Sequence, residues 1–160
     1  MAKPIPDGFH TLTPHLIVPD GALAIEFYKK AFGAQEQGRL LSPNGQSVMH
    51  AQLKIGGSIL MLGGEFPPNS LAPKNRGGTG VVLHLYTEDA DTAFDRAVKA
   101  GCTVTMPMAD TFWGDHYGQV EDPYGHKWSI ATHKHDYTDA QIAANSKEFF
   151  AKMSRPPQPA

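Results

Sequence analysis

The 160-residue sequence contains a single cysteine, Cys102. A disulfide or a Cys-x-x-Cys zinc site needs at least two thiols, so one chain can form neither, and a reducing compartment is expected. The N-terminus lacks a basic-then-apolar signal pattern, and no apolar run approaches the roughly 20 residues that cross a bilayer. We therefore expect a cytoplasmic protein with no membrane partner.

The sequence also has little charge of either sign. Its 14 Lys and Arg residues nearly balance its 16 Asp and Glu residues, which leaves a formal net charge of −2. This balance gives no long-range field that would attract a polyanion, so nucleic acid is not expected as a partner. The apolar fraction of 41% and the chain length fit one globular domain, residues 1–160.

Two halves of the chain show the same order of one strand, one helix and three strands. In the first half Asp20 is a plausible N-cap and Gly33 a helix stop; in the second, Asp89 or Asp91 can cap a helix that Gly101 ends. The expected strands cover residues 12–18, 35–41, 46–55 and 58–62, and then 81–86, 102–106, 117–121 and 127–132. The pattern predicts a tandem duplication.

The spacing of glycines supports this duplication. Gly33 and Gly101 are 68 positions apart, and so are Gly57 and Gly125. Equal offsets are typical of an internal repeat. We place repeat 1 at about residues 11–64, a Pro- and Gly-rich linker at 65–80 and repeat 2 at about 81–133.

A further helix is expected near the C-terminus, at about residues 139–152. Thr138 and Gln141 fit a capping box, and the apolar positions form one stripe: Ile142, Phe149, Phe150 and Met153. We expect this helix to pack on the body or on a second subunit. Residues 155–160 are expected to form a disordered tail.

Strand parity separates the residues that face the helices from those that face away. In the helix of repeat 1 the predicted buried stripe is Leu23, Phe27 and Ala31. In strand 46–55 the predicted helix-facing residues are Met49, Ala51, Leu53 and Ile55, which leaves Val48, His50, Gln52 and Lys54 opposite. By the same rule Thr13 and His15 in the first strand, and Val82, His84 and Tyr86 in the fifth, face away from the helices.

If the two repeats curl toward each other, these outward faces line one cup. Apolar walls with a few neutral polar groups are typical of a pocket for a small organic molecule. The candidate ligand-binding residues are His15, His50, Gln52, His84, Tyr86, Trp113, Tyr117 and Ser129. Neither the ligand nor any catalytic residue is fixed by the pattern.

Four short motifs resemble one known family. They are Thr13-Pro14-His15-Leu16; the segment from His50 to Gly57; Thr111-Phe112-Trp113-Gly114; and Asp122-Pro123-Tyr124-Gly125. Over about residues 11–133 the chain is similar to the glyoxalase, bleomycin-resistance and extradiol-dioxygenase superfamily, the vicinal oxygen chelate (VOC) proteins, and within it to the PhnB-like branch. The resemblance implies an α+β fold: two tandem βαβββ repeats form an open, cupped mixed β-sheet with helices on the outer face. It also implies a homodimer.

Metal-using members of this superfamily place one ligand on each of four strands. The matching positions here are Thr13, His50, Val82 and Ser129, of which only His50 is a competent ligand. The resemblance therefore implies that the standard metal centre is absent and that no cofactor is needed. A displaced divalent-metal site formed by His15, His50 and His84 stays open as an alternative.

Two functions follow from these observations. The first is a binding protein that holds a small, partly apolar organic molecule without metal, like the bleomycin-resistance members that the motifs resemble. The second is a metal-dependent lyase, isomerase or dioxygenase that uses His50 with His15 or His84. The sequence leaves open whether the protein is an enzyme.

Overall fold

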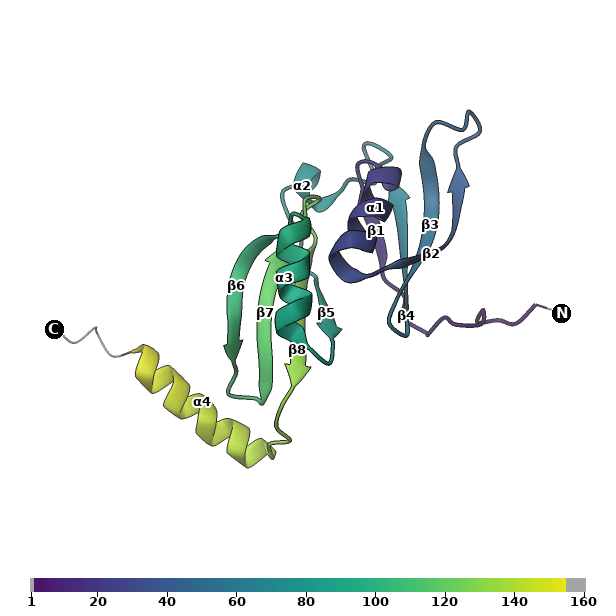
Figure 1. Ribbon diagram of the computed structural model, residues 1–160. Helices are drawn as coiled ribbons and strands as arrows, with labels where there is room; N and C mark the ends of the chain where they lie inside the picture. The colour runs from purple at the N-terminus through teal and green to yellow at the C-terminus, as the bar shows by residue number, and fades with distance from the viewer. Residues whose placement is uncertain (1, 155–160) are drawn as a thin grey trace.

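The computed structural model describes residues 2–154, and it contains two four-stranded sheets, one in each repeat (Figure 1). Repeat 1 contains β1 (His15–Val18), α1 (Gly21–Phe32), β2 (Gln35–Leu41), β3 (Val48–Ile55) and β4 (Ser58–Gly64). Repeat 2 contains β5 (Val82–Tyr86), α3 (Ala90–Ala100), β6 (Thr103–Asp110), β7 (Asp115–Glu121) and β8 (Lys127–His133). Helix α2 (Pro73–Arg76) lies in the linker, and α4 (Asp139–Met153) follows repeat 2.

The two sheets have the same topology. Their strand orders are β1-β4-β3-β2 and β5-β8-β7-β6. In each sheet the first and last strands of the repeat pair in parallel, and the other neighbours pair antiparallel. The α+β class and the two βαβββ units predicted from the sequence are confirmed. Strands β1 and β5 are edge strands, each with one side free of sheet pairing.

Both main helices begin and end where the sequence predicts. The Asp20 side chain accepts a hydrogen bond from the Leu23 amide at 3.0 Å, and Asp89, not Asp91, caps α3 through the Thr92 amide at 3.0 Å. Such caps satisfy amide groups that have no partner inside the helix. Gly33 ends α1 with a φ of 65°, a left-handed conformation that glycine adopts without a steric penalty.

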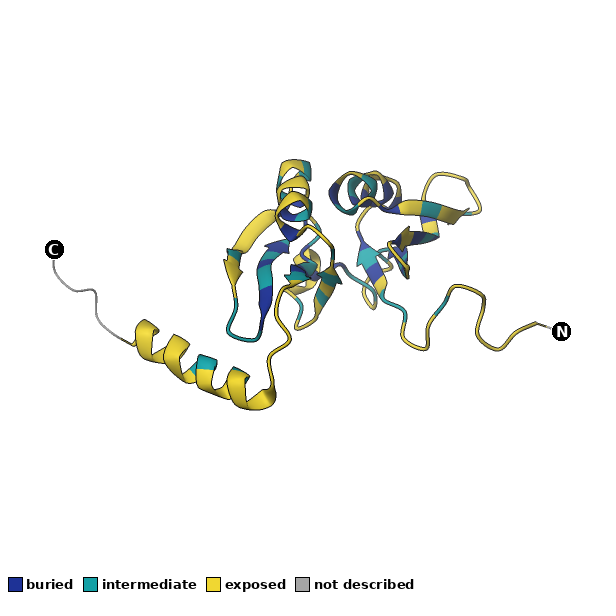
Figure 2. Ribbon diagram, turned by 60° about the horizontal axis from the view of Figure 1, so that its bottom comes forward, coloured by how far each residue is buried: buried dark blue, intermediate teal, exposed yellow. Residues whose placement is uncertain are grey.

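Helices α1 and α3 lie side by side, and the two repeats share one core between them (Figure 2). The rings of Phe32 and Trp128 stack at 4.2 Å. Beside them, the buried Asp122 carboxylate accepts hydrogen bonds from the Tyr28 hydroxyl at 2.8 Å and the Trp128 indole at 3.0 Å. Aromatic packing and a satisfied buried carboxylate therefore join the repeats.

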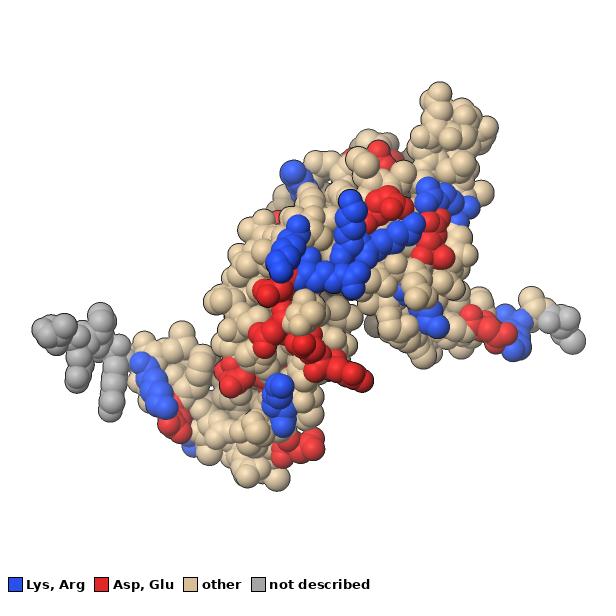
Figure 3. All heavy atoms as spheres, viewed as in Figure 1, with Lys and Arg blue, Asp and Glu red and all other residues tan. Residues whose placement is uncertain are grey.

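Basic side chains gather over α1 and α3 (Figure 3). Lys30, Arg96 and Lys99 surround one shallow hollow there. The Arg96 guanidinium donates to the backbone carbonyls of Lys30 at 2.6 Å and Lys29 at 3.0 Å, so it holds the C-terminal turn of α1 against α3. This basic group therefore has a structural partner.

Two details of the predicted faces are wrong. Leu23 is 65% exposed, and Ala24, Ile25 and Tyr28 are buried instead, because α1 packs against both its own sheet and α3. In β3, Val48 is buried and Met49 is 53% exposed. The pairing of β3 with β2 shifts register between Leu40 and Leu41, and a β-bulge of this kind reverses the parity at the strand end. From His50 onward the predicted alternation is confirmed.

Helix α4 stands apart from both sheets (Figures 1 and 2). The predicted capping box is present, since Thr138 accepts from the Gln141 amide at 3.3 Å and the Gln141 side chain accepts from the Thr138 amide at 2.9 Å. None of the helix residues is buried. Asn145 donates to the Phe112 carbonyl at 3.3 Å, and the rings of Phe149 and Phe150 lie 5.6 and 6.0 Å from the Phe112 ring.

Within residues 2–154 no helix is long and apolar enough to cross a membrane. The predicted tail at 155–160 lies outside the described residues.

Candidate functional site

His84 is at the centre of a polar and aromatic cluster on the helix-free face of the second sheet. Its Nδ1 atom lies 2.6 Å from the hydroxyl of Ser129, its neighbour across the parallel pair β5 and β8. The imidazole meets the Tyr86 ring edge-on at 4.4 Å and stacks on Tyr117 at 5.8 Å. The Trp113 ring lies next to the Tyr117 ring, with 5.5 Å between the ring centroids. Five of the eight predicted ligand-binding residues therefore lie together.

A buried carboxylate holds this cluster from one side. Asp115 is 3% exposed and accepts hydrogen bonds from the Tyr86 hydroxyl at 2.9 Å, the Trp113 indole at 3.0 Å and His133 Nδ1 at 2.7 Å. Burial opposes ionisation of Asp115, but the three donated hydrogen bonds outweigh it and lower the pKa of this carboxyl below its ordinary value. Asp115 therefore fixes two aromatic side chains of the cluster.

The sequence pattern does not predict a role for Asp115. It predicts a strand that begins at Tyr117, whereas β7 begins at Asp115, two residues earlier on the same face. The available signal was an isolated carboxylate directly after the Trp113-Gly114 turn and two residues before Tyr117 on the same face.

The other three predicted residues lie on the first sheet. The rings of His15 and His50 meet edge-on at 5.4 Å, and Gln52 follows His50 on the same face of β3. Burial, and then the neighbouring His50, lower the pKa of His15 below its ordinary value. This pair of imidazoles is separate from the His84 cluster, and the described contacts include none that join the two groups.

The residues do not fit a metal site within one chain. Across residues 2–154, no three His, Cys, Asp or Glu side chains are grouped so that they could hold a metal ion, and this includes the candidate set of His15, His50 and His84. At the four standard positions Val82 has no donor atom, and the Ser129 hydroxyl is engaged by His84. The prediction that no cofactor is used stays a prediction.

A largely apolar cavity of about 420 Å³ opens where the two sheets meet. One wall consists of Leu12, Thr13 and Pro14, which precede β1, and the other wall consists of β5 from Val82 to Leu85. Thr13, Val82 and His84 belong to the predicted cup lining, and the sequence did not predict the other residues that line this cavity. Its other lining residues are His10, Ile55, Ser58, Ile59, Leu60, Val81 and Trp128. Sequence periodicity gives no signal for a cavity formed between two strand edges.

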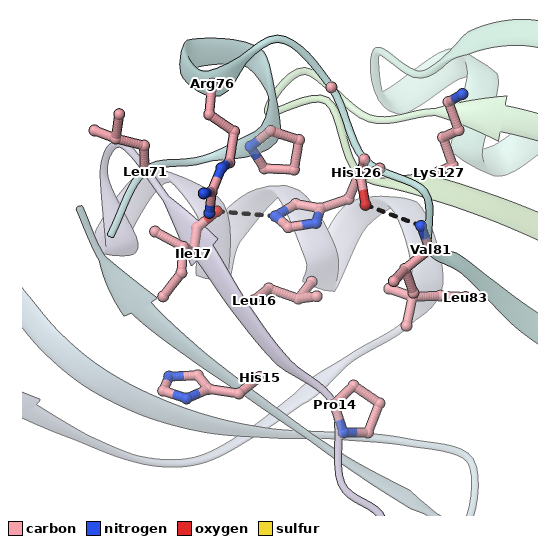
Figure 4. Close-up of a pocket in the computed structure, with 13 residues that line it drawn as sticks. Pro14, His15, Leu16, Ile17, Leu71, Arg76, Val81, Leu83, His126 and Lys127 are labelled. Atoms are coloured by element: carbon pink, nitrogen blue, oxygen red, sulfur yellow. Dashed lines mark hydrogen bonds between the residues drawn. The ribbon is translucent and has the colours of Figure 1, made fainter. Parts of the chain in front are cut away.

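A smaller cavity of about 270 Å³ continues along β1 under the linker (Figure 4). His126 lies in its centre and its Nε2 atom donates to the Ile17 carbonyl at 2.9 Å, which ties the turn before β8 to the free side of β1. Arg76, from α2, extends toward the same carbonyl in Figure 4. Pro14, Val81 and Leu83 line both cavities, so the two cavities adjoin.

Two βαβββ units, each with one helix-covered face and one open face, define the structural class of this chain. The family model described as the Glyoxalase/Bleomycin resistance protein/Dioxygenase superfamily matches residues 8–130. The chain therefore belongs to this superfamily, as the sequence motifs predicted.

Similar proteins share most of this length. The uncharacterized protein Mb0911c of Mycobacterium bovis is 47% identical over 123 residues, which cover 74% of this chain and 80% of that protein. The X-ray structure of the Arabidopsis thaliana product At5g48480 is 33% identical, covers 77% of this chain and 98% of that one, and has a TM-score of 0.62. The crystal structure of TioX from Micromonospora sp. ML1 is 26% identical, covers 81% and 100%, and has a TM-score of 0.60.

Proposed function

We propose that this chain binds a small, partly apolar organic molecule and that it does so without the standard metal centre of the VOC superfamily. The observation that carries this proposal is the junction cavity of about 420 Å³, which has mainly apolar walls and His84 at its edge. Cavities of this size and composition are typical of small-molecule sites. The aromatic cluster of Tyr86, Tyr117 and Trp113 lies next to His84 and extends the surface available to a ligand.

The cavity supplies two kinds of interaction. Leu12 and Val82 are 87% and 41% exposed. A ligand that covers them removes apolar surface from water, which favours binding by about 25 cal/mol for each Å² buried. His84 supplies a directional contact. Because its Nδ1 atom is engaged by Ser129, Nε2 is the ring nitrogen that remains for a ligand, as donor or acceptor according to the tautomer.

Ligand binding is tested by thermal shift and calorimetry with neutral probes such as 2-naphthol, indole and 1-octanol. We expect at least one probe to raise the melting temperature, and His84→Ala to weaken its binding by about two- to tenfold, the effect of one neutral hydrogen bond. His135→Ala, which removes an imidazole outside both cavities, is the matched control. If no probe binds the wild-type protein, the proposal is rejected.

The metal-dependent alternative rests on the His15 and His50 pair, whose rings lie 5.4 Å apart. It is tested by elemental analysis for Fe, Mn, Ni, Co and Zn in protein purified without a histidine tag. Our proposal expects substoichiometric metal. Stoichiometric metal that disappears in His50→Ala would favour a lyase, isomerase or dioxygenase instead.

The proposal also includes the branch of the superfamily, the cellular compartment and the oligomeric state. We place the chain in the PhnB-like branch on the strength of its motifs, and in the cytoplasm on the strength of its single cysteine. A homodimer is supported by the apolar residues Phe149, Phe150 and Met153 of α4, which are 42%, 56% and 69% exposed. Exposed apolar stripes of this kind are typical of protein interfaces.

A further inference from the structure

The smaller cavity, of about 270 Å³, is lined by basic side chains, whereas the larger cavity of about 420 Å³ has no Lys or Arg among its described lining residues. The lining of the smaller cavity includes Arg76, His126 and Lys127, and among residues 2–154 no Asp or Glu lines either cavity. Within the described part of the chain neither Arg76 nor Lys127 forms an ion pair. The Arg76 side chain therefore borders a concave surface whose described lining supplies no anion.

The position of Arg76 is fixed by the surrounding backbone. Glu65 accepts hydrogen bonds from the Ala72 amide at 2.8 Å and from the Asn75 side chain at 2.7 Å, which closes the linker into a compact loop. The Lys74 amide donates to the Tyr124 carbonyl at 3.0 Å and so attaches α2 to the second repeat. The Arg76 side chain extends from this anchored turn into the cavity, toward Ile17 and His126 (Figure 4).

The two cavities together have one basic end and one apolar body. The basic end lies under α2, and the apolar body lies between Leu12 and Val82, with shared walls at Pro14, Val81 and Leu83. A neutral ligand would fill the apolar body only. A molecule with an anionic head and an apolar body would use both ends.

We propose that the ligand carries a carboxylate, which pairs with Arg76, while its aliphatic or aromatic body occupies the larger cavity. The proposal rests on the proposed function and specifies the chemistry of its ligand. A guanidinium presents two parallel N–H groups that match a carboxylate, and such charge-assisted hydrogen bonds are stronger than neutral ones. No carboxylate of the described lining competes with the ligand for Arg76.

The test compares two acids with their amides, which differ in charge but hardly in shape. Octanoate and octanamide represent an aliphatic body, and 3-phenylpropanoate and 3-phenylpropanamide represent an aromatic one. Calorimetry at low salt should show at least one acid binding about tenfold more tightly than its amide. Added salt should weaken the binding of the acid and leave the binding of the amide unchanged.

Two variants locate the effect. Arg76→Gln should remove the advantage of the acid over the amide, whereas Lys99→Gln, an exposed basic residue that lines neither cavity, should preserve it. Val82→Ser should weaken the binding of the acid and of the amide to the same extent. Melting curves of each variant establish that it is folded.

The outcomes separate this inference from the proposed function. If an amide binds as well as its acid, or if the acid keeps its advantage in Arg76→Gln, the carboxylate assignment is overturned while small-molecule binding stands. If none of the four compounds binds, the carboxylate assignment is also overturned, and the neutral probes described above then decide the proposed function separately.

Discussion

The carboxylate of Asp115 lies 2.7 Å from Nδ1 of His133, and the opposite nitrogen of that imidazole lies 2.9 Å from Asp136. His133 ends β8, and Asp136 belongs to the segment that leads into α4. A single imidazole therefore links the buried carboxylate behind the aromatic cluster to the segment that positions the C-terminal helix.

This link should make stability depend on pH. Hydrogen bonds to Asp115 and then Asp136 raise the pKa of His133, whereas the pKa of Asp115 is lowered. A raised histidine pKa gives stability that is complete below the unfolded value near 6.5 and is lost as pH rises through the folded value. A lowered aspartate pKa gives stability that is present above the unfolded value of 3.8 and is lost as pH falls through the folded value.

The stabilising contributions of protonated His133 and ionised Asp115 are both present between roughly pH 4 and pH 6.5. We expect His133→Gln to lower the melting temperature most in that window and progressively less above it. The measurement is a series of melting curves from pH 4 to pH 9 for the wild type, His133→Gln and the control His10→Gln. A difference between wild type and His133→Gln that does not change with pH would contradict this account.

Asp115→Asn tests the carboxylate itself. The amide keeps one acceptor oxygen but places an NH₂ group among three donors, from Tyr86, Trp113 and His133. Leaving buried donors without an acceptor costs about 1–3 kcal/mol, so we expect a loss of that order in the free energy of unfolding. Urea denaturation measures it, with the exposed Asp95→Asn as the control. A loss no larger than that of the control would show that Asp115 is dispensable.

Sequence reasoning works well where the determining interactions are local. Asp20 caps α1 through the amide three residues later, and Gly33 ends the helix by its own backbone conformation, so both were predicted from neighbouring residues. The buried set of α1 depends on α3, and this is why Leu23 was placed on the wrong face. Parity along β3 was correct except near its first residues, where the bulge intervenes.

The candidate site shows the same division. Parity correctly placed His84 and Ser129 on one face, because that relationship depends only on strand geometry and pairing. It did not predict that the His15 and His50 pair would be separate from the His84 cluster, since that depends on how the two sheets are arranged. Arg76 lines the smaller cavity because the linker folds back over β1. The sequence contains no periodic pattern that predicts this fold of the linker.

Tyr28→Phe tests the buried contact between the repeats. The Tyr28 hydroxyl donates to Asp122 at 2.8 Å, and burial and then Asp122 raise the pKa of Tyr28 well above its ordinary value. Asp122 keeps its other donors in the variant, including the Trp128 indole. We expect a loss of about 1–2 kcal/mol in the free energy of unfolding, measured by urea denaturation. Tyr137→Phe, at the surface, should show almost no loss; equal losses in both variants would argue against the contact.

The last prediction concerns α4 and the proposed homodimer. Phe149, Phe150 and Met153 are exposed in one chain, and the helix buries none of its own residues. Replacing all three by Ser should therefore leave the melting temperature of the body nearly unchanged but shift the protein from dimer to monomer in analytical ultracentrifugation. Lys147→Ser with Lys152→Ser changes exposed residues of the same helix and should leave the dimer intact. A triple variant that remains dimeric would show that α4 does not form the interface, whereas one that loses its melting transition would show that the helix stabilises the body of its own chain.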